Sequence, residues 1–462
     1  SSAAIGHSLC VSRLTEANDL ATQALNSYHA KLELGAGEMS EMELQRALEW
    51  IDPAKNETRA RLLLALAEVL ETLGRNRDAL DALETAIGLL EKYGRRADLQ
   101  IAFELKGRVA FALRDIEMAQ MAFENALRLA RELNQATLIA DILSQSGYLH
   151  FSIRKLDVAE KEYQEALEQY RSLSGTNPDQ SRRGMASQWS NLGHVSYARS
   201  DFEQAETCHQ KAIEIYTALA DEKHVANQWG YLGHTYFAAR DYTKAVNAYE
   251  QAAEHDESAG NPLMAAQRYA NMGHTMYARR EPKEAQHLFE TALEKYKAQG
   301  NANGEAAQYS NLGLVKGDQG EFDRAVEYFN QAKDIYEEMG DQINAVTQMI
   351  RLGHVRRGQN DLEAAKQNYK DAMERYHALN YSLGEGDTAM ELGQVNVALN
   401  EFEEAAEHFT LANGIFVKLE HKEKEAMCLM LLAQVRKVQG DTDTSLKLFN
   451  DACELYKQME NP

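Results

Sequence analysis

The chain has 462 residues, of which 71 are Asp or Glu and 49 are Lys or Arg, so its formal net charge is −22. This acidic balance disfavours nucleic acid as a partner and favours a protein with a basic or neutral docking segment. The four cysteines are scattered, which argues against a disulfide framework. Because the sequence has neither a long apolar run nor a signal peptide, we expect no membrane span and a cytoplasmic location.

Residues 1–59 differ from the rest of the chain because they do not follow its repeat. Amphipathic patterns predict two helices here, Leu14 to Leu34 and Met42 to Ile51, with a glycine-containing turn between them. The two helices fit either a degenerate first repeat or a cap that covers the apolar end of a stack.

From residue 60 onward the sequence repeats every 40 residues, with a phase position that is usually Gly after Leu or Met. The ten phase positions are Ala67, Gly107, Gly147, Gly193, Gly233, Gly273, Gly313, Gly353, Gly393 and Ala433. A small residue follows 12 and again 19 positions later, with a large and mostly aromatic residue between them. This spacing places all three on one face of a helix, where small residues allow close approach of a second helix.

Turn signals divide each repeat into two helices. An acidic residue precedes the second helix in repeats 4 to 10, where Asp is a good N-cap and Glu a poorer one. A Gly or Asn expected to end the second helix stands 27 residues after six phase positions, at Gly94, Asn134, Gly260, Gly300, Gly340 and Asn380. We therefore predict helix-turn-helix repeats 1 to 3 in residues 60–173 and repeats 4 to 10 in residues 186–462.

One interruption separates these two blocks, since six extra residues lie between Gly147 and Gly193. The segment 174–185 is polar and contains an Asn-Pro pair, which is typical of turns. It is predicted to be an inserted loop, either a plain long loop or a junction between two rigid segments.

The repeat resembles the tetratricopeptide-repeat (TPR) signature, as in Trp189, Leu192, Gly193, Ala205 and Ala212. Its 40-residue length is similar to the elongated repeats of Pins-type scaffolds, kinesin light chains and Rap-type regulators. The resemblance implies an all-α, right-handed superhelical solenoid of about ten repeats. It also implies that the first helices line a concave groove that grips an extended or helical peptide segment of another protein.

The resemblance places the ligand contacts two positions before, one after and four after the phase position. The candidate peptide-binding residues are Asn191, His194, Tyr197, Tyr231, His234, Phe237, Asn271, His274, Tyr277, Asn311, Arg351, His354 and Arg357. The Asn residues resemble a ladder along a ligand backbone, because an amide both donates and accepts; alternatively they satisfy groups of neighbouring helices. The aromatic residues contact apolar ligand side chains or fill the stack.

The histidines allow three interpretations: a metal site, a hydrogen-bonding ladder for the ligand, or structural contacts between repeats. A row of imidazoles on helices 8–10 Å apart cannot converge on one ion, so no metal is predicted. If the histidines bind the ligand, affinity should change between about pH 5 and 8. Arg351, His354 and Arg357 form a predicted cationic patch that suits a ligand carboxylate. The Lys of chaperone-tail clamps is absent, since Ser190 and Ala270 hold that position.

The sequence contains no P-loop, zinc-protease, nucleophile-elbow or dinucleotide-binding motif. We therefore predict no catalytic activity and no cofactor. The predicted function is that of a protein-interaction scaffold or adaptor. The alternatives are a peptide-responsive regulator of a signalling partner and a sensory TPR module of a longer signalling enzyme, and self-association through the ends of the array stays open.

Overall fold

A computed structural model describes residues 2–93 and 95–460, with side chains described from residue 16 to residue 459 apart from residue 94. These residues form 22 α-helices and one short 3₁₀ turn, and no strand occurs among them. The chain is therefore an all-α helical repeat array, as the sequence predicts. Gly94, predicted to end a helix, lies outside the described residues.

Two helices precede the repeats, α1 (Ser2–Glu33) and α2 (Gly37–Trp50), which confirms the predicted pair. Gly35, at φ +73°, allows the tight turn between them, because left-handed backbone is costly for other residues. Leu44 and Ala47 are buried in one cluster with Leu62 and Val69 of the next helix. The pair thus covers the apolar surface of the first repeat.

Ten helix pairs follow, and we call the first helix of each pair the A helix and the second the B helix. The A helices are α3 (Asn56–Thr72), α5 (Arg96–Ala112), α7 (Ala136–Ser152), α9 (Pro178–Ala198), α11 (Glu222–Ala238), α13 (Pro262–Ala278), α15 (Ala302–Asp318), α17 (Gln342–Gly358), α19 (Ser382–Ala398) and α21 (Lys422–Val438). The B helices are α4 (Asn76–Tyr93), α6 (Ile116–Glu132), α8 (Leu156–Ser172), α10 (Phe202–Ala218), α12 (Tyr242–Ser258), α14 (Pro282–Ala298), α16 (Phe322–Glu338), α18 (Leu362–Ala378), α20 (Phe402–Lys418) and α22 (Thr442–Glu460).

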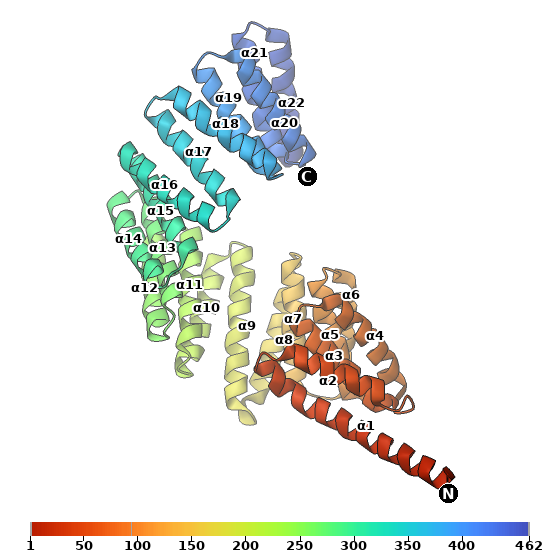
Figure 1. The fold of residues 1–462 in the computed structure, drawn as a ribbon. Coiled ribbons are helices and arrows are strands. Elements are labelled where there is room, and N and C mark those ends of the chain that lie inside the picture. The colour runs from red at the N-terminus through yellow and green to blue at the C-terminus, as the bar shows by residue number, and fades with distance from the viewer. Residues whose placement is uncertain (1, 94, 461–462) are drawn as a thin grey trace. The chain divides into compact units, whose positions relative to one another are not determined.

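The array divides into two compact parts, one up to Tyr231 and one from Leu232 onward, here called the N-terminal and C-terminal parts. Within each part every helix packs on the helix before it and the helix after it (Figure 1). Each repeat therefore buries its apolar surface against its neighbours, as expected of a solenoid.

The phase glycine is required by the aromatic ring 16 residues later. A Cβ added at Gly313 would lie 2.6 Å from the Phe329 ring, and the same contact recurs from Gly107 to Gly393. The ring thus lies directly on the backbone of the A helix. In the first repeat, Ala67 stands in place of the phase glycine and Leu83 in place of the ring. The larger phase residue is thus combined with a smaller side chain 16 residues later.

Buried polar pairs also join consecutive A helices. The amide of Gln228 donates to Ser190 Oγ at 3.0 Å, and the hydroxyl of Ser310 donates to Gln348 Oε1 at 2.6 Å. These buried groups are satisfied by partners one repeat away, so the register between neighbouring repeats is specified.

One junction differs from this pattern. Asp256 occupies a position that is aromatic in most repeats, and Arg268 occupies the position of Gln228 and Gln348. Both are buried, and Arg268 Nε donates to Asp256 Oδ2 at 3.0 Å. A buried ion pair therefore replaces neutral packing between α12 and α13.

The helix caps follow the chemistry expected from the sequence. Asp201 and Asp361 accept a hydrogen bond from a backbone N–H of the first turn, whereas Glu281, Glu321 and Glu401 make no such side-chain cap. The shorter Asp side chain reaches the free N–H groups, and the longer Glu does not.

The residues predicted to end the B helices have positive φ at all five described positions, which are Asn134, Gly260, Gly300, Gly340 and Asn380. The left-handed conformation there closes each helix as predicted.

The segment 174–185 differs from the predicted inserted loop. The 3₁₀ turn (Leu173–Gly175) follows α8 directly, and α9 already begins at Pro178. Asn177 is the N-cap and Pro178 the first helical residue, a position where the missing N–H of proline costs little. Most of the extra residues therefore lengthen α9, and the Asn-Pro pair starts a helix instead of forming a loop.

Candidate functional site

Four cavities lie along the A helices of the C-terminal part, and neighbouring cavities share a lining residue. Cavity A (about 390 Å³) and cavity B (about 350 Å³) share Asp318, and cavity B and cavity C (about 300 Å³) share His354. Cavity C and cavity D (about 320 Å³) share Gln394. The shared residues link the four cavities into a row from α13 to α21, which we call the A-helix groove.

Cavity B is lined by a glycine at a position where other repeats carry a ring. Repeats 4, 5 and 6 carry Tyr197, Phe237 and Tyr277 four positions after the phase glycine, whereas repeat 7 carries Gly317. A Cβ at Gly317 would come no nearer than 4.0 Å to its neighbours, so packing does not demand glycine there. The walls are mainly apolar and include Leu314, Phe322, Phe329 and Val355.

Arg351 is the basic residue that lines cavity B. Its Nη1 is buried and has no hydrogen-bond partner, and its guanidinium lies 5.9 Å from the centre of the Phe329 ring. Burial lowers the pKa of Arg351, because the apolar surroundings disfavour the charged form.

The other two residues of the predicted cationic patch have partners. Arg357 Nη1 donates to Glu391 Oε2 at 2.8 Å, and His354 Nδ1 shares a hydrogen bond of 2.8 Å with the Tyr369 hydroxyl. Lys424, which lines cavity C, likewise pairs with Asp387. The structure thus brings Arg351, His354 and Arg357 onto one helix face but neutralises Arg357.

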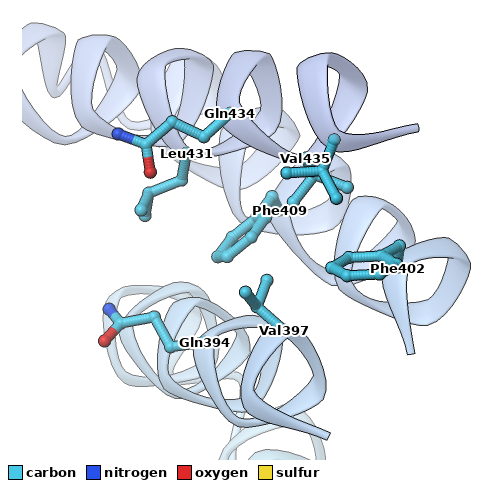
Figure 2. Close-up of a pocket in the computed structure, with 8 residues that line it drawn as sticks. Gln394, Val397, Phe402, Phe409, Leu431, Gln434 and Val435 are labelled. Atoms are coloured by element: carbon cyan, nitrogen blue, oxygen red, sulfur yellow. The ribbon is translucent and has the colours of Figure 1, made fainter. Parts of the chain in front are cut away.

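Cavity D extends the groove beyond the predicted residues. Figure 2 shows Leu431 and Gln434 of α21 facing Gln394 and Val397 of α19, with Phe409 between them. The candidate residues predicted from the sequence lie in repeats 4 to 8, so they do not include the residues of cavity D.

The four predicted histidines lie over the residue 15 positions later in their own repeat. His234 and His354 share hydrogen bonds with Tyr249 and Tyr369, and the His274 ring packs edge-on against Phe289. Burial is the main cause that lowers the pKa of His234, His274 and His354. They are therefore neutral at pH 7, and each pKa lies below that of an unperturbed imidazole.

His194 lies in the N-terminal part, between two other rings. Its ring is 4.4 Å from that of Tyr231 and 5.3 Å from that of His209. Burial lowers the pKa of His194 and of His209 to about 4. Tyr231 remains 36% exposed, so the outer face of this aromatic group reaches solvent.

The predicted Asn residues make hydrogen bonds within their own helices, and Asn311 also makes one to the preceding repeat. Asn191 and Asn311 donate to a Gln three residues earlier, at 3.4 and 3.2 Å, and Asn271 accepts from Gln267 at 3.2 Å. Asn311 also lies 3.4 Å from His274 Nε2. Since no described residue donates to Oδ1 of Asn191 or Asn311, these oxygens retain acceptor capacity for a ligand.

Two predicted aromatic residues both pack and remain exposed. Tyr197 contacts Phe202 and Phe237 contacts Tyr242, in each case at the start of the following B helix. Tyr197 is 41% and Phe237 38% exposed, so each presents one ring face to solvent. The third, Tyr277, lines cavity A and donates its hydroxyl hydrogen to Asp318.

Among the residues that the structure describes, no three His, Cys, Asp or Glu side chains converge in a way that suits a metal ion. No described helix combines the length and apolar character that crossing a membrane requires.

Comparisons with known proteins agree on the repeat. The tetratricopeptide-repeat family profile matches residues 184–258, and the profile described as soluble NSF attachment protein, SNAP, matches residues 233–386. No curated protein matches the sequence significantly.

Two solved structures with similar folds cover most of the chain. Apo RapI is 13% identical with a TM-score of 0.55, over 87% of this chain and 99% of that chain. A STAND ATPase with a tetratricopeptide-repeat sensor from Pyrococcus horikoshii is 13% identical with a TM-score of 0.50, over 90% of this chain and 65% of that chain. BtubC from P. vanneervenii is 22% identical with a TM-score of 0.42, over 50% of this chain and 92% of that chain. At these identities RapI and the STAND protein show a shared fold alone.

Proposed function

Since this chain is a tetratricopeptide-repeat protein, we propose that it is a non-catalytic interaction scaffold whose A-helix groove binds a peptide segment of another protein. The observation that carries the proposal is the continuity of the four cavities from α13 to α21. A row of linked cavities whose walls combine apolar groups with polar and charged ones suits an extended or helical segment better than a compact small molecule.

The exposed apolar side chains of the groove support the same function. Val397 is 36% exposed, Met427 46% and Val438 64%, and all three line cavity C or D. Apolar groups on a surface rich in charge mark interaction sites, and methionine adapts to ligand side chains of different shape.

The groove assignment is tested by filling cavity B. Gly317→Phe restores the ring that other repeats carry at this position and occupies the space that the peptide would enter. The matched control is Gly414→Phe, because Gly414 lies on α20 with no atom within 4 Å of an added Cβ. Peptides selected by the wild-type protein from a random phage-displayed library serve as probes.

We expect Gly317→Phe to lower the affinity for the selected peptides by at least about tenfold, a loss of roughly 1.4 kcal/mol in binding free energy. Gly414→Phe should leave this affinity unchanged. Circular dichroism establishes that both variants keep the helical fold. Equal affinity for all three proteins would show that the A-helix groove is not the binding site.

A further inference from the structure

Arg351 is a partly buried cation without a counter-ion among the described residues. No carboxylate of the described residues lies within ion-pair distance of its guanidinium, and its Nη1 is buried without a hydrogen-bond partner. A buried charge that lacks a partner is costly, whereas a paired one is tolerated. The ring of Phe329, 5.9 Å from the guanidinium, offers only partial compensation.

The groups around Arg351 are neutral at pH 7. Tyr336 and Tyr277 interact with the charge of Arg351, and both have a raised pKa mainly because of burial. The histidines that interact with its charge, His274 and His354, have a lowered pKa, also mainly because of burial. None of these four side chains supplies a negative charge to Arg351.

Asp318 lines the same cavity but is engaged elsewhere. Its Oδ2 accepts the hydroxyl hydrogen of Tyr277, and the carboxylate is largely exposed at the border of cavity A. Lys424 of cavity C pairs with Asp387, and Arg357 on the same helix as Arg351 pairs with Glu391, while Arg280 lines cavity A and is exposed. Arg351 is thus the cation of cavity B that is left for a ligand.

The chemistry of the site selects the ligand group. A guanidinium binds a carboxylate through parallel hydrogen bonds, and one unpaired arginine matches the single charge of a carboxylate better than the double charge of a phosphate. Cavities A and C continue the groove on both sides of cavity B, so a bound chain passes through instead of ending there. This favours an acidic side chain over a C-terminal carboxylate.

We propose that Arg351 binds the carboxylate of a single Asp or Glu inside the partner's docking segment, and that the apolar walls of cavity B hold the methylene groups of that residue and its neighbour. The proposal rests on the proposed function, because it names the group that the groove recognises. A single acidic residue within an otherwise neutral or basic segment also agrees with the net charge of −22, which repels strongly acidic chains.

The test compares two small probes that differ only in charge, N-acetylglutamate α-amide and N-acetylglutamine α-amide. Their binding to wild type, Arg351→Gln and Arg356→Gln is measured by ligand-observed NMR. Arg356 is the matched control, because it lies on the same helix and its guanidinium donates to Gln359 outside the groove cavities. Arg351→Gln keeps a polar side chain of similar reach and removes the charge.

We expect wild type and Arg356→Gln to prefer the glutamate probe by about tenfold, and Arg351→Gln to bind the two probes equally. Equal binding of the two probes by wild type, or an undiminished preference in Arg351→Gln, would overturn the proposal.

The selected peptides separate this failure from that of the proposed function. In the selected peptides, each Asp or Glu can be replaced by Asn or Gln. If the peptides bind in the groove but this replacement lowers their affinity for wild type and for Arg351→Gln by the same factor, the acidic recognition is wrong and the groove function stands. If Gly317→Phe leaves peptide binding intact while the probe preference depends on Arg351, the groove function fails and the carboxylate site remains.

Discussion

Two glycines one turn apart on α15 should respond in opposite directions to the same substitution. A Cβ at Gly313 would lie 2.6 Å from Phe329, which is 0.8 Å short of the 3.4 Å at which ordinary contact begins. The ring is only 1% exposed and cannot move outward. A Cβ at Gly317 would meet nothing closer than 4.0 Å.

The magnitudes follow from two effects. Glycine inside a helix is less stable than alanine by about 1 kcal/mol, so both variants gain this amount. Overpacking a close-packed site costs about 1–3 kcal/mol, and only Gly313→Ala bears that cost. Gly317→Ala should therefore stabilise the protein by up to about 1 kcal/mol. Because the helix-propensity gain is common to both, the difference between the variants measures the overpacking.

Native-state hydrogen exchange of the α15 and α16 amides is the suitable assay, because a repeat array need not unfold in one step. The double variant Gly313→Ala with Phe329→Leu copies the Ala67 and Leu83 pair of the first repeat. It should recover most of the stability that Gly313→Ala loses through overpacking. Equal shifts for the two single variants, or no recovery in the double variant, would refute the packing argument.

Two further predictions concern buried groups outside the groove. Replacing Asp256 or Arg268 alone should lower the free energy of unfolding by about 3–5 kcal/mol. The double variant Asp256→Tyr with Arg268→Gln, which introduces the residue types of other repeats, should lower it little. A loss in the double variant equal to the sum of the two single losses, measured by denaturation, would contradict this. His209 has a pKa of about 4 in the fold against 6.5 unperturbed, so the unfolded chain binds a proton first as pH falls and stability drops from about pH 6.5 to 4. Between pH 7 and 4.5, His209→Phe should lose about 2–3 kcal/mol less of its free energy of unfolding than wild type, as measured by urea denaturation. An unchanged acid sensitivity would exclude His209 as its source.

Much of the fold could be predicted because its contacts are local. The prediction of TPR-type repeats is confirmed by the family profile and by the ten helix pairs. The cap difference between Asp361 and Glu321 also followed from side-chain length alone. The inserted loop was predicted wrongly, since Asn177 and Pro178 have the same residue preferences in a turn as at a helix start.

The groove was predicted less well, although one signal was available. Gly317 interrupts the row of Tyr197, Phe237 and Tyr277, and a glycine in place of a ring indicates space. The candidate residues in repeats 4 to 8 remain predictions as ligand contacts. The structure adds that Arg357 is paired, that the histidines are neutral, and that the groove continues to Leu431 and Gln434.

Residues within one 40-residue unit were sufficient to predict the repeat and the two helices in each repeat, whereas the contact between each phase glycine and its ring came from the structure. Only the tertiary structure decided which charges are paired and where the groove is open. Tyr277 meets Asp318 across 41 residues and Arg357 meets Glu391 across 34, so both contacts cross between repeats. These contacts engage the carboxylates of Asp318 and Glu391, whereas Nη1 of Arg351 has no hydrogen-bond partner among the described residues.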